Sequence, residues 1–363
     1  MKVAVDARLM SGHVRGMGQY ARMLTKPVAD QLWPLLPKAR ADEITGEGLA
    51  AGWGFEPWWE QVCLPRLARE SGASFLLCPA NTGPVRRVSG MRTILVIHDL
   101  IYMLPTSILP WSTSRYQNLG RIYRRMVVPQ AARHADCILT VSHFTRRQLL
   151  SDLGLHAQQV HVVPNTIDAD WFVEEPRSDQ DRVPDVLCVA GEAPSKNVPR
   201  LIEAFARVVR APDLAHLRLV LAGINPRFHA VYRQHALAAG LQEQQCALLP
   251  PVPKAELQQM YRQAWGVVMP SLYEGFGIPL LEAMASGTPV ACSNATSLPE
   301  VAGGAAWLFD PRDVPQMADQ IAAMCRSPQR DQQRRAGQLH VKTLYHPDVV
   351  AVQAQQFWVS LGS

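Results

Sequence analysis

The sequence predicts an α/β protein with two domains, and three observations carry this prediction. Short apolar runs, such as residues 2–6, 93–97 and 218–222, alternate with helical stretches, which is the pattern of parallel strands connected by helices. The chain has 363 residues, more than one core usually supports and enough for two domains of ordinary size. Hydrophobic residues make up 48% of the chain, as in a globular protein.

Charge and cysteine content narrow the class of protein. The net charge of +5 suits anionic substrates or an anionic bilayer surface and is too weak to indicate a nucleic-acid partner. The seven cysteines are scattered without a C-x-x-C pair, which is typical of reduced thiols in the cytosol. The chain has no apolar run long enough for a membrane span, and its N-terminus enters a strand without an apolar signal core. We therefore expect a cytoplasmic protein.

The first strand, residues 2–6, is followed by a loop that contains Gly16 and Gly18, and then by a helix over residues 19–24. A G-x-G turn between strand and helix is a weak sign of a phosphate-binding loop. An ordinary strand-to-helix turn explains the two glycines equally well.

Residues 53–69 form an aromatic and basic stretch that allows two interpretations. One is a membrane interface, where tryptophan rings and arginine heads meet anionic lipid. The other, which we favour, is a helix that Pro65 bends and that packs on the sheet ahead of a strand at residues 74–78. The basic cluster further along the chain is typical of a solvated helix face. The residues concerned are Trp53, Trp58, Trp59, Arg66 and Arg69, and in the cluster Arg121, Arg124 and Arg125.

His98 follows a buried type of strand at residues 93–97. Ligands bind at the carboxyl ends of parallel strands, so this position suits a functional residue. A core histidine bonded to a neighbouring carbonyl is the structural alternative. Asp99 is predicted to cap a helix or loop. Further on, Ser142 is predicted to cap a helix that ends near Gly154.

The middle of the chain contains a polar linker and a candidate cationic residue. Residues 174–185 are charged and interrupted by prolines, and a strand at residues 186–190 follows them. Lys196 then precedes an amphipathic helix, and its ammonium could neutralise a bound anion; an exposed surface lysine is the alternative. Asp168 and Asp170 imitate a D-x-D metal pair, but their place at a domain boundary favours loop capping.

The most informative stretch is residues 271–290, which read SLYEGFGIPLLEAMASGTPV. Glu274 and Glu282 are separated by a loop and a helix start. Gly275 and Gly277 permit close approach of the backbone, and Pro279 suits the first position of a helix. Gly287 is predicted to end that helix, which places Glu282 in its first turn.

This geometry predicts an anion site. The N–H groups of Phe276, Gly277 and Ile278 should be unpaired at the positive end of the helix dipole. Glu274 and Glu282 would flank them. A diphosphate that carries a sugar at one end and a ribose at the other fits such a site, because each carboxylate can accept hydrogen bonds from hydroxyl groups.

The two glutamates and the residues between them resemble the E-x7-E motif of retaining GT-B glycosyltransferases of family 4. The resemblance covers nearly the whole chain and is densest over residues 186–311. It implies a GT-B fold, with two Rossmann-like domains facing a central cleft. Residues 1–170 would form the acceptor-side domain, residues 171–345 the nucleotide-sugar domain, and residues 346–363 a helix that crosses back to the first domain.

The resemblance also implies roles for individual residues. His98, Lys196 and Glu274 would be catalytic, with His98 near the reacting carbon of the donor sugar. Lys196 matches the lysine of the family pattern E-P-R-K-N, while Ser195 replaces the arginine, for which Arg200 is a candidate substitute. The donor would contact the first glycine loop, the base cradle, and the loop and helix of the motif: Gly16, Gly18, Lys196, Val252, Leu257, Glu274, Gly275, Phe276, Gly277, Ile278 and Glu282.

The implied function is retaining transfer of a hexose, with mannose from GDP-mannose favoured, from a nucleotide-diphosphate sugar to a glycan or lipid-linked acceptor. The setting would be bacterial surface polysaccharide, O-antigen or lipopolysaccharide biosynthesis. No metal and no cofactor are expected, and association with the inner membrane surface stays open. Two alternatives remain. Another GT-B sugar enzyme, of epimerase or phosphorylase type, is one; a phosphorylase would need a lysine-bound pyridoxal site, for which no pattern is present. A non-catalytic scaffold of a glycan-assembly complex is the other, and it should lack Glu274, Glu282 or Lys196.

Overall fold

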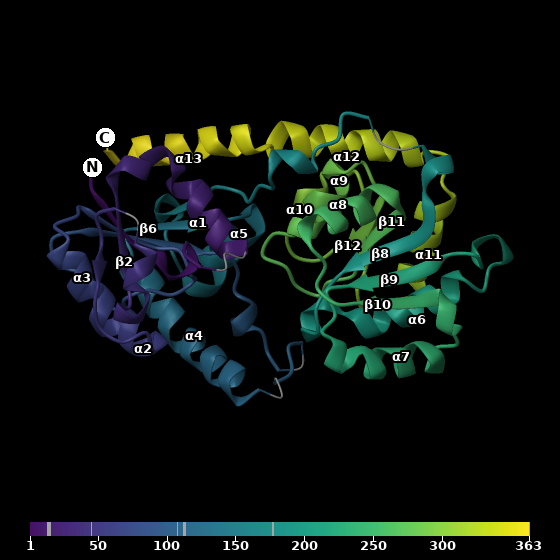
Figure 1. Ribbon diagram of the computed structural model, residues 1–363, viewed down its shortest axis with the longest axis horizontal. Helices are drawn as coiled ribbons and strands as arrows, with labels where there is room; N and C mark the ends of the chain where they lie inside the picture. Colours follow the sequence, from purple (N-terminus) through teal and green to yellow (C-terminus); the bar gives the residue numbers. More distant parts are fainter. Residues whose placement is uncertain (13–15, 45, 107, 112–113, 176–177, 363) are drawn as a thin grey trace. The chain divides into compact units, whose positions relative to one another are not determined.

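The computed structural model describes residues 1–12, 16–44, 46–106, 108–111, 114–175 and 178–362 (Figure 1). The chain forms two units, Met1–Asn165 together with Asp348–Ser363, and Thr166–Pro347. Each unit is built on a parallel sheet, so the α/β fold with two Rossmann-like domains is confirmed. The division lies five residues earlier than position 170, and residues 348–363 belong to the first unit.

The sheet of the first unit has seven parallel strands in the order β3-β2-β1-β4-β5-β6-β7. Their bounds are Val3–Asp6 (β1), Leu32–Leu36 (β2), Leu49–Ala50 (β3), Phe75–Cys78 (β4), Arg92–Ile97 (β5), Cys137–Thr140 (β6) and Val160–Val162 (β7). The residues of β1, β4 and β6 are buried throughout, as expected for strands covered on both faces. The sequence analysis missed β2, which contains Pro34, because proline argues against a strand inside a sheet.

The second unit has a six-stranded parallel sheet in the order β10-β9-β8-β11-β12-β13. Its strands are Val183–Val189 (β8), Arg218–Ala222 (β9), Cys246–Leu249 (β10), Ala264–Met269 (β11), Val290–Ser293 (β12) and Trp307–Phe309 (β13). β8 begins at Val183, three residues before the predicted start, so the end of the predicted linker is part of the sheet. Pro176 and Arg177 of that linker lie outside the described residues.

Helices connect the strands in both units (Figure 1). In the first unit they are α1 (Gly16–Thr25), α2 (Glu56–Trp58), α3 (Leu64–Glu70), α4 (Arg115–His134), α5 (His143–Leu153) and α13 (Pro347–Gly362). In the second unit they are α6 (Val198–Val208), α7 (His229–Ala238), α8 (Lys254–Gln263), α9 (Ile278–Ala285), α10 (Leu298–Ala302), α11 (Val314–Arg326) and α12 (Arg330–Leu344). No described helix is both long enough and apolar enough to cross a bilayer.

The C-terminal helix α13 is joined to α1 by a bond between distant parts of the sequence. The indole Nε1 of Trp358 donates a hydrogen bond of 2.7 Å to the carbonyl of Leu24, and Trp358 is buried.

Two predicted caps are also present. Ser142 Oγ accepts from the N–H of Thr145 at 3.1 Å, and Gly154 ends α5 in the left-handed region. Asp99 Oδ1 accepts from the N–H of Ile101 at 3.0 Å.

The aromatic stretch at residues 53–69 packs on the sheet, as we favoured. Trp59 and Leu64 are fully buried. The chain forms a π-helical turn over Trp59–Cys63 between α2 and α3, and this wider turn comes just before Pro65, which has no N–H for the regular helical bond. Trp53 and Trp58, in contrast, are 68% and 51% exposed, so only part of the stretch belongs to the core.

Candidate active site at the carboxyl ends of β8 and β11

The candidate site follows the two central strands of the second sheet. β8 pairs with β11, and the chain runs outward from β8 through β9 and β10 before returning to β11. The loops after β8 and β11 therefore leave the sheet side by side, at the switch point where parallel α/β sheets bind ligands. The first loop carries Lys196 and the second carries Glu274.

The two loops are joined by their own backbone. The N–H of Leu272 donates to the carbonyl of Ser195 at 2.7 Å. Asn197 adopts a left-handed φ of 58°, and its Nδ2 donates to the carbonyls of Pro270 and Pro311 at 3.0 and 2.7 Å. Lys196 lies between these two anchored residues, so the position of its backbone is set on both sides.

Lys196 and Glu274, predicted separately, form an ion pair. Lys196 Nζ lies 2.7 Å from Glu274 Oε1, and Ser271 Oγ donates to the same oxygen at 2.7 Å. The side chains are 28% and 15% exposed, so both are held in place and still reach solvent. No described residue donates to Oε2 of Glu274, which leaves this oxygen free for a ligand hydroxyl.

The start of α9 presents the backbone amides that the sequence predicted. Gly277 precedes the helix with a φ of 116°, and a Cβ there would lie 2.6 Å from Leu298, so a side chain does not fit. Ser297 Oγ donates to the carbonyls of Glu274 and Phe276 at 3.0 and 2.8 Å. Within the described residues, the N–H groups of Phe276, Gly277 and Ile278 have no acceptor. Gly275 lies in the same loop.

The helix differs from the prediction at its first turn. α9 begins at Ile278, so Pro279 is its second residue and Glu282 its fifth. Glu282 therefore lies beyond the first turn of the helix. The prediction that it lies in the first turn was wrong. The reason is that Gly277, with its positive φ, already completes the loop and allows the helix to start one residue early. Gly287 follows the helix with a φ of 66°, as predicted.

Glu282 is held by helix α8. Tyr261 OH donates to Glu282 Oε2 at 3.0 Å, and burial raises the pKa of Glu282 to about 7. Leu257 lies four residues before Tyr261 in α8, on the same side of the helix, and Val252 lies in the loop before α8. Glu282 is thus bonded to the helix that also carries Leu257, through Tyr261, which the sequence analysis did not identify.

The position of the missing arginine is closed to solvent. Ser195 is 4% exposed. The proposed substitute, Arg200 in α6, donates from Nη1 to Asn197 Oδ1 at 3.0 Å, so its guanidinium is bonded to the residue that follows Lys196. A contact between Arg200 and a diphosphate remains a prediction.

In the first unit, His98 has the bonds of a core histidine. It is 7% exposed, its Nε2 lies 3.0 Å from the carbonyl of Pro79, and its ring packs edge-on against Tyr20 at 5.1 Å. Burial lowers the pKa of His98 to about 4, so the ring is neutral at pH 7. Because a neutral Nε2 bonded to a carbonyl carries the proton, Nδ1 is left as an acceptor.

Gly16 and Gly18 do not lie in a loop between strand and helix, as the sequence suggested, but inside a helix. Both lie in the first turn of α1, which begins at Gly16 instead of Gln19. Their helix also carries Tyr20, the residue that contacts His98. The backbone thus becomes helical three residues earlier than predicted. The part of the predicted loop at residues 13–15 lies outside the described residues.

The two aspartates of the D-x-D sequence share a cation from the protein. Lys254 Nζ lies 2.5 Å from Asp168 Oδ2 and 2.9 Å from Asp170 Oδ2. Among the described residues, no group of three or more His, Cys, Asp or Glu is placed to hold a metal ion.

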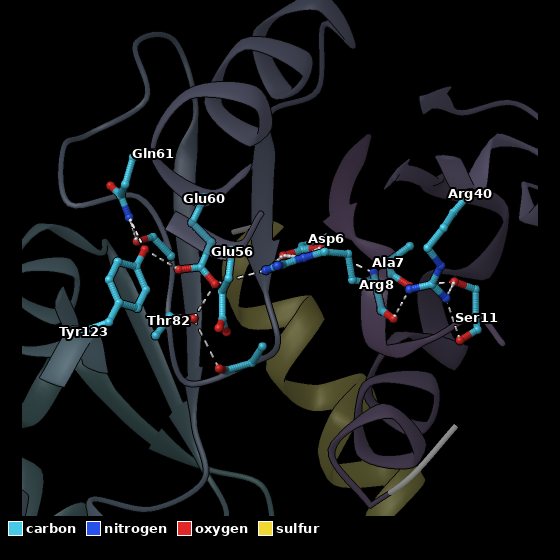
Figure 2. A network of polar contacts seen from close by, with 12 residues as sticks. Asp6, Ala7, Arg8, Ser11, Arg40, Glu56, Glu60, Gln61, Thr82 and Tyr123 are labelled. Atoms are coloured by element: carbon cyan, nitrogen blue, oxygen red, sulfur yellow. Dashed lines mark hydrogen bonds and ion pairs between the residues drawn. The ribbon is translucent and has the colours of Figure 1, made fainter. Parts of the chain in front are cut away.

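A buried polar network in the first unit was also missed (Figure 2). Arg8 Nη2 bonds Asp6 at 2.8 Å and Glu60 at 3.0 Å. Glu60 is fully buried and also accepts from Thr82 and Tyr123, at 2.6 and 2.8 Å. Its partners are 22 to 63 residues away in sequence, so no local pattern could have indicated them.

Comparisons with known proteins identify the family and the fold. The model of "Glycosyl transferases group 1" matches residues 172–339, and that of "Glycosyltransferase Family 4" matches residues 58–171. The O-antigen chain mannosyltransferase B of Escherichia coli is 30% identical over 236 residues, which are 61% of this chain and 58% of that protein. The MMP alpha-(1->4)-mannosyltransferase of Mycolicibacterium hassiacum is 32% identical over 216 residues, 55% of this chain and 47% of that protein. The chain thus spans about half the length of these curated relatives.

Solved structures share the fold. The Anabaena protein HepE, in complex with UDP-glucose, has a TM-score of 0.74 at 17% identity, covering 99% of this chain and 100% of its own. The sucrose-phosphate synthase of Thermosynechococcus elongatus has a TM-score of 0.72 at 18% identity, covering 99% of both chains. The chain has two parallel sheets of this topology, and the two family models together match residues 58–339. It therefore belongs to the glycosyltransferases that these two models describe, and it has the GT-B fold.

Proposed function

We propose that the protein is a retaining glycosyltransferase that moves a hexose from a nucleotide-diphosphate sugar to a glycan or lipid-linked acceptor. The observation that carries this proposal is the ion pair of Lys196 and Glu274 beside the unpaired amides of Phe276, Gly277 and Ile278. A lone ion pair is common on protein surfaces. Here a cation, a carboxylate and three N–H donors that no described residue accepts from follow the two central strands of one sheet, a set of groups that suits a sugar diphosphate.

The chemistry we assign to these groups is stabilisation of charge. The bond between the anomeric carbon and the diphosphate oxygen breaks, and a bond from the acceptor oxygen to the same carbon forms on the same face. The acceptor proton passes to the departing phosphate oxygen. Lys196 and the amides stabilise the negative charge that develops on the diphosphate, while Glu274 holds the sugar hydroxyls as positive charge develops on the ring.

Glu282 and the base cradle would fix the nucleotide. Tyr261 already occupies one oxygen of Glu282, so the other can meet the ribose hydroxyls. With a pKa of about 7, this carboxyl offers either an acceptor or a donor near neutral pH. Leu257 and Val252 would line the base. His98, Gly16 and Gly18 stay proposed donor-site residues on the strength of the family resemblance alone.

We infer that mannose is the sugar, GDP its carrier, and surface polysaccharide or O-antigen the product. The support comes from relatives described as mannosyltransferases. HepE was solved with UDP-glucose, so the base and sugar must be tested directly. We further propose that the reaction needs no metal and that the protein works at the inner face of the membrane.

A thermal-shift panel tests the proposal. The purified protein is heated with GDP, UDP or dTDP, and with the corresponding sugar nucleotides. A ligand at a hundred times its dissociation constant adds about 2.7 kcal/mol to the free energy of unfolding, so GDP and GDP-mannose should raise the melting temperature above all others. A larger shift with UDP would change the donor. If no nucleotide raises the melting temperature of the wild-type protein, even with metal added, the protein would instead be a non-catalytic scaffold.

A further inference from the structure

Helix α4 exposes a row of large apolar side chains. Tyr116, Leu119, Ile122 and Met126 are 76%, 65%, 41% and 57% exposed. They follow one another at intervals of three and four residues, so they share one side of the helix. Single exposed apolar residues are ordinary on protein surfaces, whereas a continuous row indicates a site of contact. We call these four residues the α4 face.

A second apolar group lies next to this helix. Trp53, Phe55 and Trp58 are 68%, 52% and 51% exposed, and the rings of Trp53 and Phe55 are 5.4 Å apart. The α2 segment that carries them is bonded to α4, because Arg124 Nη2 lies 3.4 Å from Glu56 Oε1. Figure 1 shows α2 beside α4. The exposed aromatic rings are therefore carried on a segment bonded to α4, through an arginine that lies on another side of the helix from the α4 face.

The charge of α4 has one sign. The helix contains five arginines and no aspartate or glutamate, although the whole chain has a net charge of only +5. Arg115, Arg125 and Arg133 are exposed. The helix dipole accounts for a cation at the C-terminal end, such as Arg133, but it disfavours Arg115 at the first position. The basic residues therefore indicate an external anionic partner.

Arg121 shows that the helix is anchored from beneath. Its guanidinium is buried and donates to the carbonyls of Leu104 and Leu109 at 2.6 and 2.7 Å. The exposed arginines and the α4 face are then carried on a fixed support. A helix of 20 residues presents its side chains over about 30 Å.

We propose that the α4 face and the neighbouring aromatic rings dock the protein on an anionic lipid bilayer. The apolar side chains would enter the boundary between headgroups and acyl chains, with the exposed arginines at the lipid phosphates. Tryptophan rings favour this interfacial depth. A second copy of the chain fits less well, because pairing two such faces would bring two sets of arginines together. The inference rests on the proposed function, since a lipid-linked acceptor lies in the same bilayer.

Vesicle flotation tests the inference. Phosphatidylcholine vesicles containing phosphatidylglycerol should carry the wild-type protein upward, and vesicles of phosphatidylcholine alone should carry much less. The double variant Leu119→Glu with Met126→Glu should lose flotation. The double variant Arg115→Gln with Arg125→Gln should bind roughly 30-fold more weakly, since each basic residue near an anionic surface contributes about 1 kcal/mol.

The matched control is Val231→Glu with Leu237→Glu in α7. These two residues are 61% and 54% exposed on a helix of the second unit, so the control carries the same change of charge and should float like the wild type. Equal flotation of the control and the α4 variant would overturn the inference, as would a wild type that ignores anionic vesicles. A dimer in light scattering that only the α4 variant abolishes would assign the face to a second copy.

The outcomes for docking and for the proposed function are separable. Flotation requires no nucleotide, and the α4 variants should keep the thermal shift that the nucleotide gives to the wild type. If no nucleotide binds while flotation persists, the proposed function fails and docking stands. If nucleotides bind and flotation is absent, the reverse holds.

Discussion

The two units place polar residues at the same point of their sheets and use them in opposite ways. In both sheets the strand order changes direction between the two central strands, β1 and β4 in one and β8 and β11 in the other. After β1, Arg8 is bonded to Asp6 and to the fully buried Glu60, which accepts two further hydrogen bonds (Figure 2). After β8 and β11, Lys196 and Glu274 are paired but partly exposed.

The difference teaches how to separate a functional site from a structural one. Charged residues at the carboxyl ends of strands are not sufficient evidence, because the network in the first unit satisfies its own groups. Glu60 has a raised pKa, caused by burial, and no open side for a ligand. In the second unit, none of the described residues donates to Oε2 of Glu274, and none accepts from the N–H groups of Phe276, Gly277 and Ile278. Unsatisfied groups that remain accessible point to a ligand.

The largest expected effect is on turnover. Glu274→Ala or Lys196→Ala should lower kcat by about a thousandfold, the scale of losing one group that stabilises charge in the transition state. The melting temperature should change little, because this pair is partly exposed and solvent screens its attraction. Steady-state kinetics and thermal melts measure both. The control is Arg218→Ala. Arg218 is the first residue of β9, and its ion pair with Asp185 has the same length of 2.7 Å. A similar loss of kcat in this variant would show that Lys196 and Glu274 have no special role.

The next effect is on folding of the first unit. Glu60→Ala should lower the free energy of unfolding by about 3 kcal/mol, because it leaves the largely covered charge of Arg8 without one of its two partners. Denaturant titration measures this. Glu70→Ala, which breaks the exposed pair with Arg66, should leave stability nearly unchanged. If Glu60→Ala keeps its stability but loses turnover, the network belongs to the site.

A third, smaller effect follows from Glu282. Burial raises its pKa from 4.5 to about 7, so the folded state disfavours the charged form, and this cost grows as the pH rises from 4.5 through 7. Glu282→Gln removes the cost. Its melting temperature relative to the wild type should increase over that range and level off above pH 7, while its nucleotide affinity falls. A difference that does not depend on pH would show that the carboxyl is not buried as described.

The smallest effect concerns His98. Its pKa is lowered from 6.5 to about 4 by burial, so its contribution to stability is complete above pH 6.5 and is lost as the pH falls towards 4. His98→Gln, whose amide can still donate to Pro79, should lose this part of the acid sensitivity in thermal melts. Unchanged kcat in the same variant would place His98 with the structural network of its unit and remove it from the catalytic set.

Some features were predictable because they depend on nearby residues. Alternation of apolar runs and helices predicted the two parallel sheets, and Ser142 and Gly154 indicated the ends of α5. Other local signals misled. Strand β2 was not predicted, and it contains Pro34, a residue type that is unusual inside a sheet. The glycines before Gln19 suggested a turn at positions where helix α1 has already begun. A short pattern indicates which residues favour a turn, but the start of a helix also depends on what packs against it.

The sequence by itself determined the alternation of strands and helices and the family, and it indicated Lys196, Glu274 and Glu282 as candidate site residues. It could do so because motifs and periodicity are properties of neighbouring residues. Tertiary structure alone decided which of these groups meet. It joined Lys196 to Glu274 across 78 residues, gave Glu282 its bond to Tyr261, and filled the first switch point with Arg8 and Glu60. The physical reason is that burial and pairing depend on the packing of segments distant in sequence, and these conditions decide whether a charged group is satisfied within the protein or left open for a ligand.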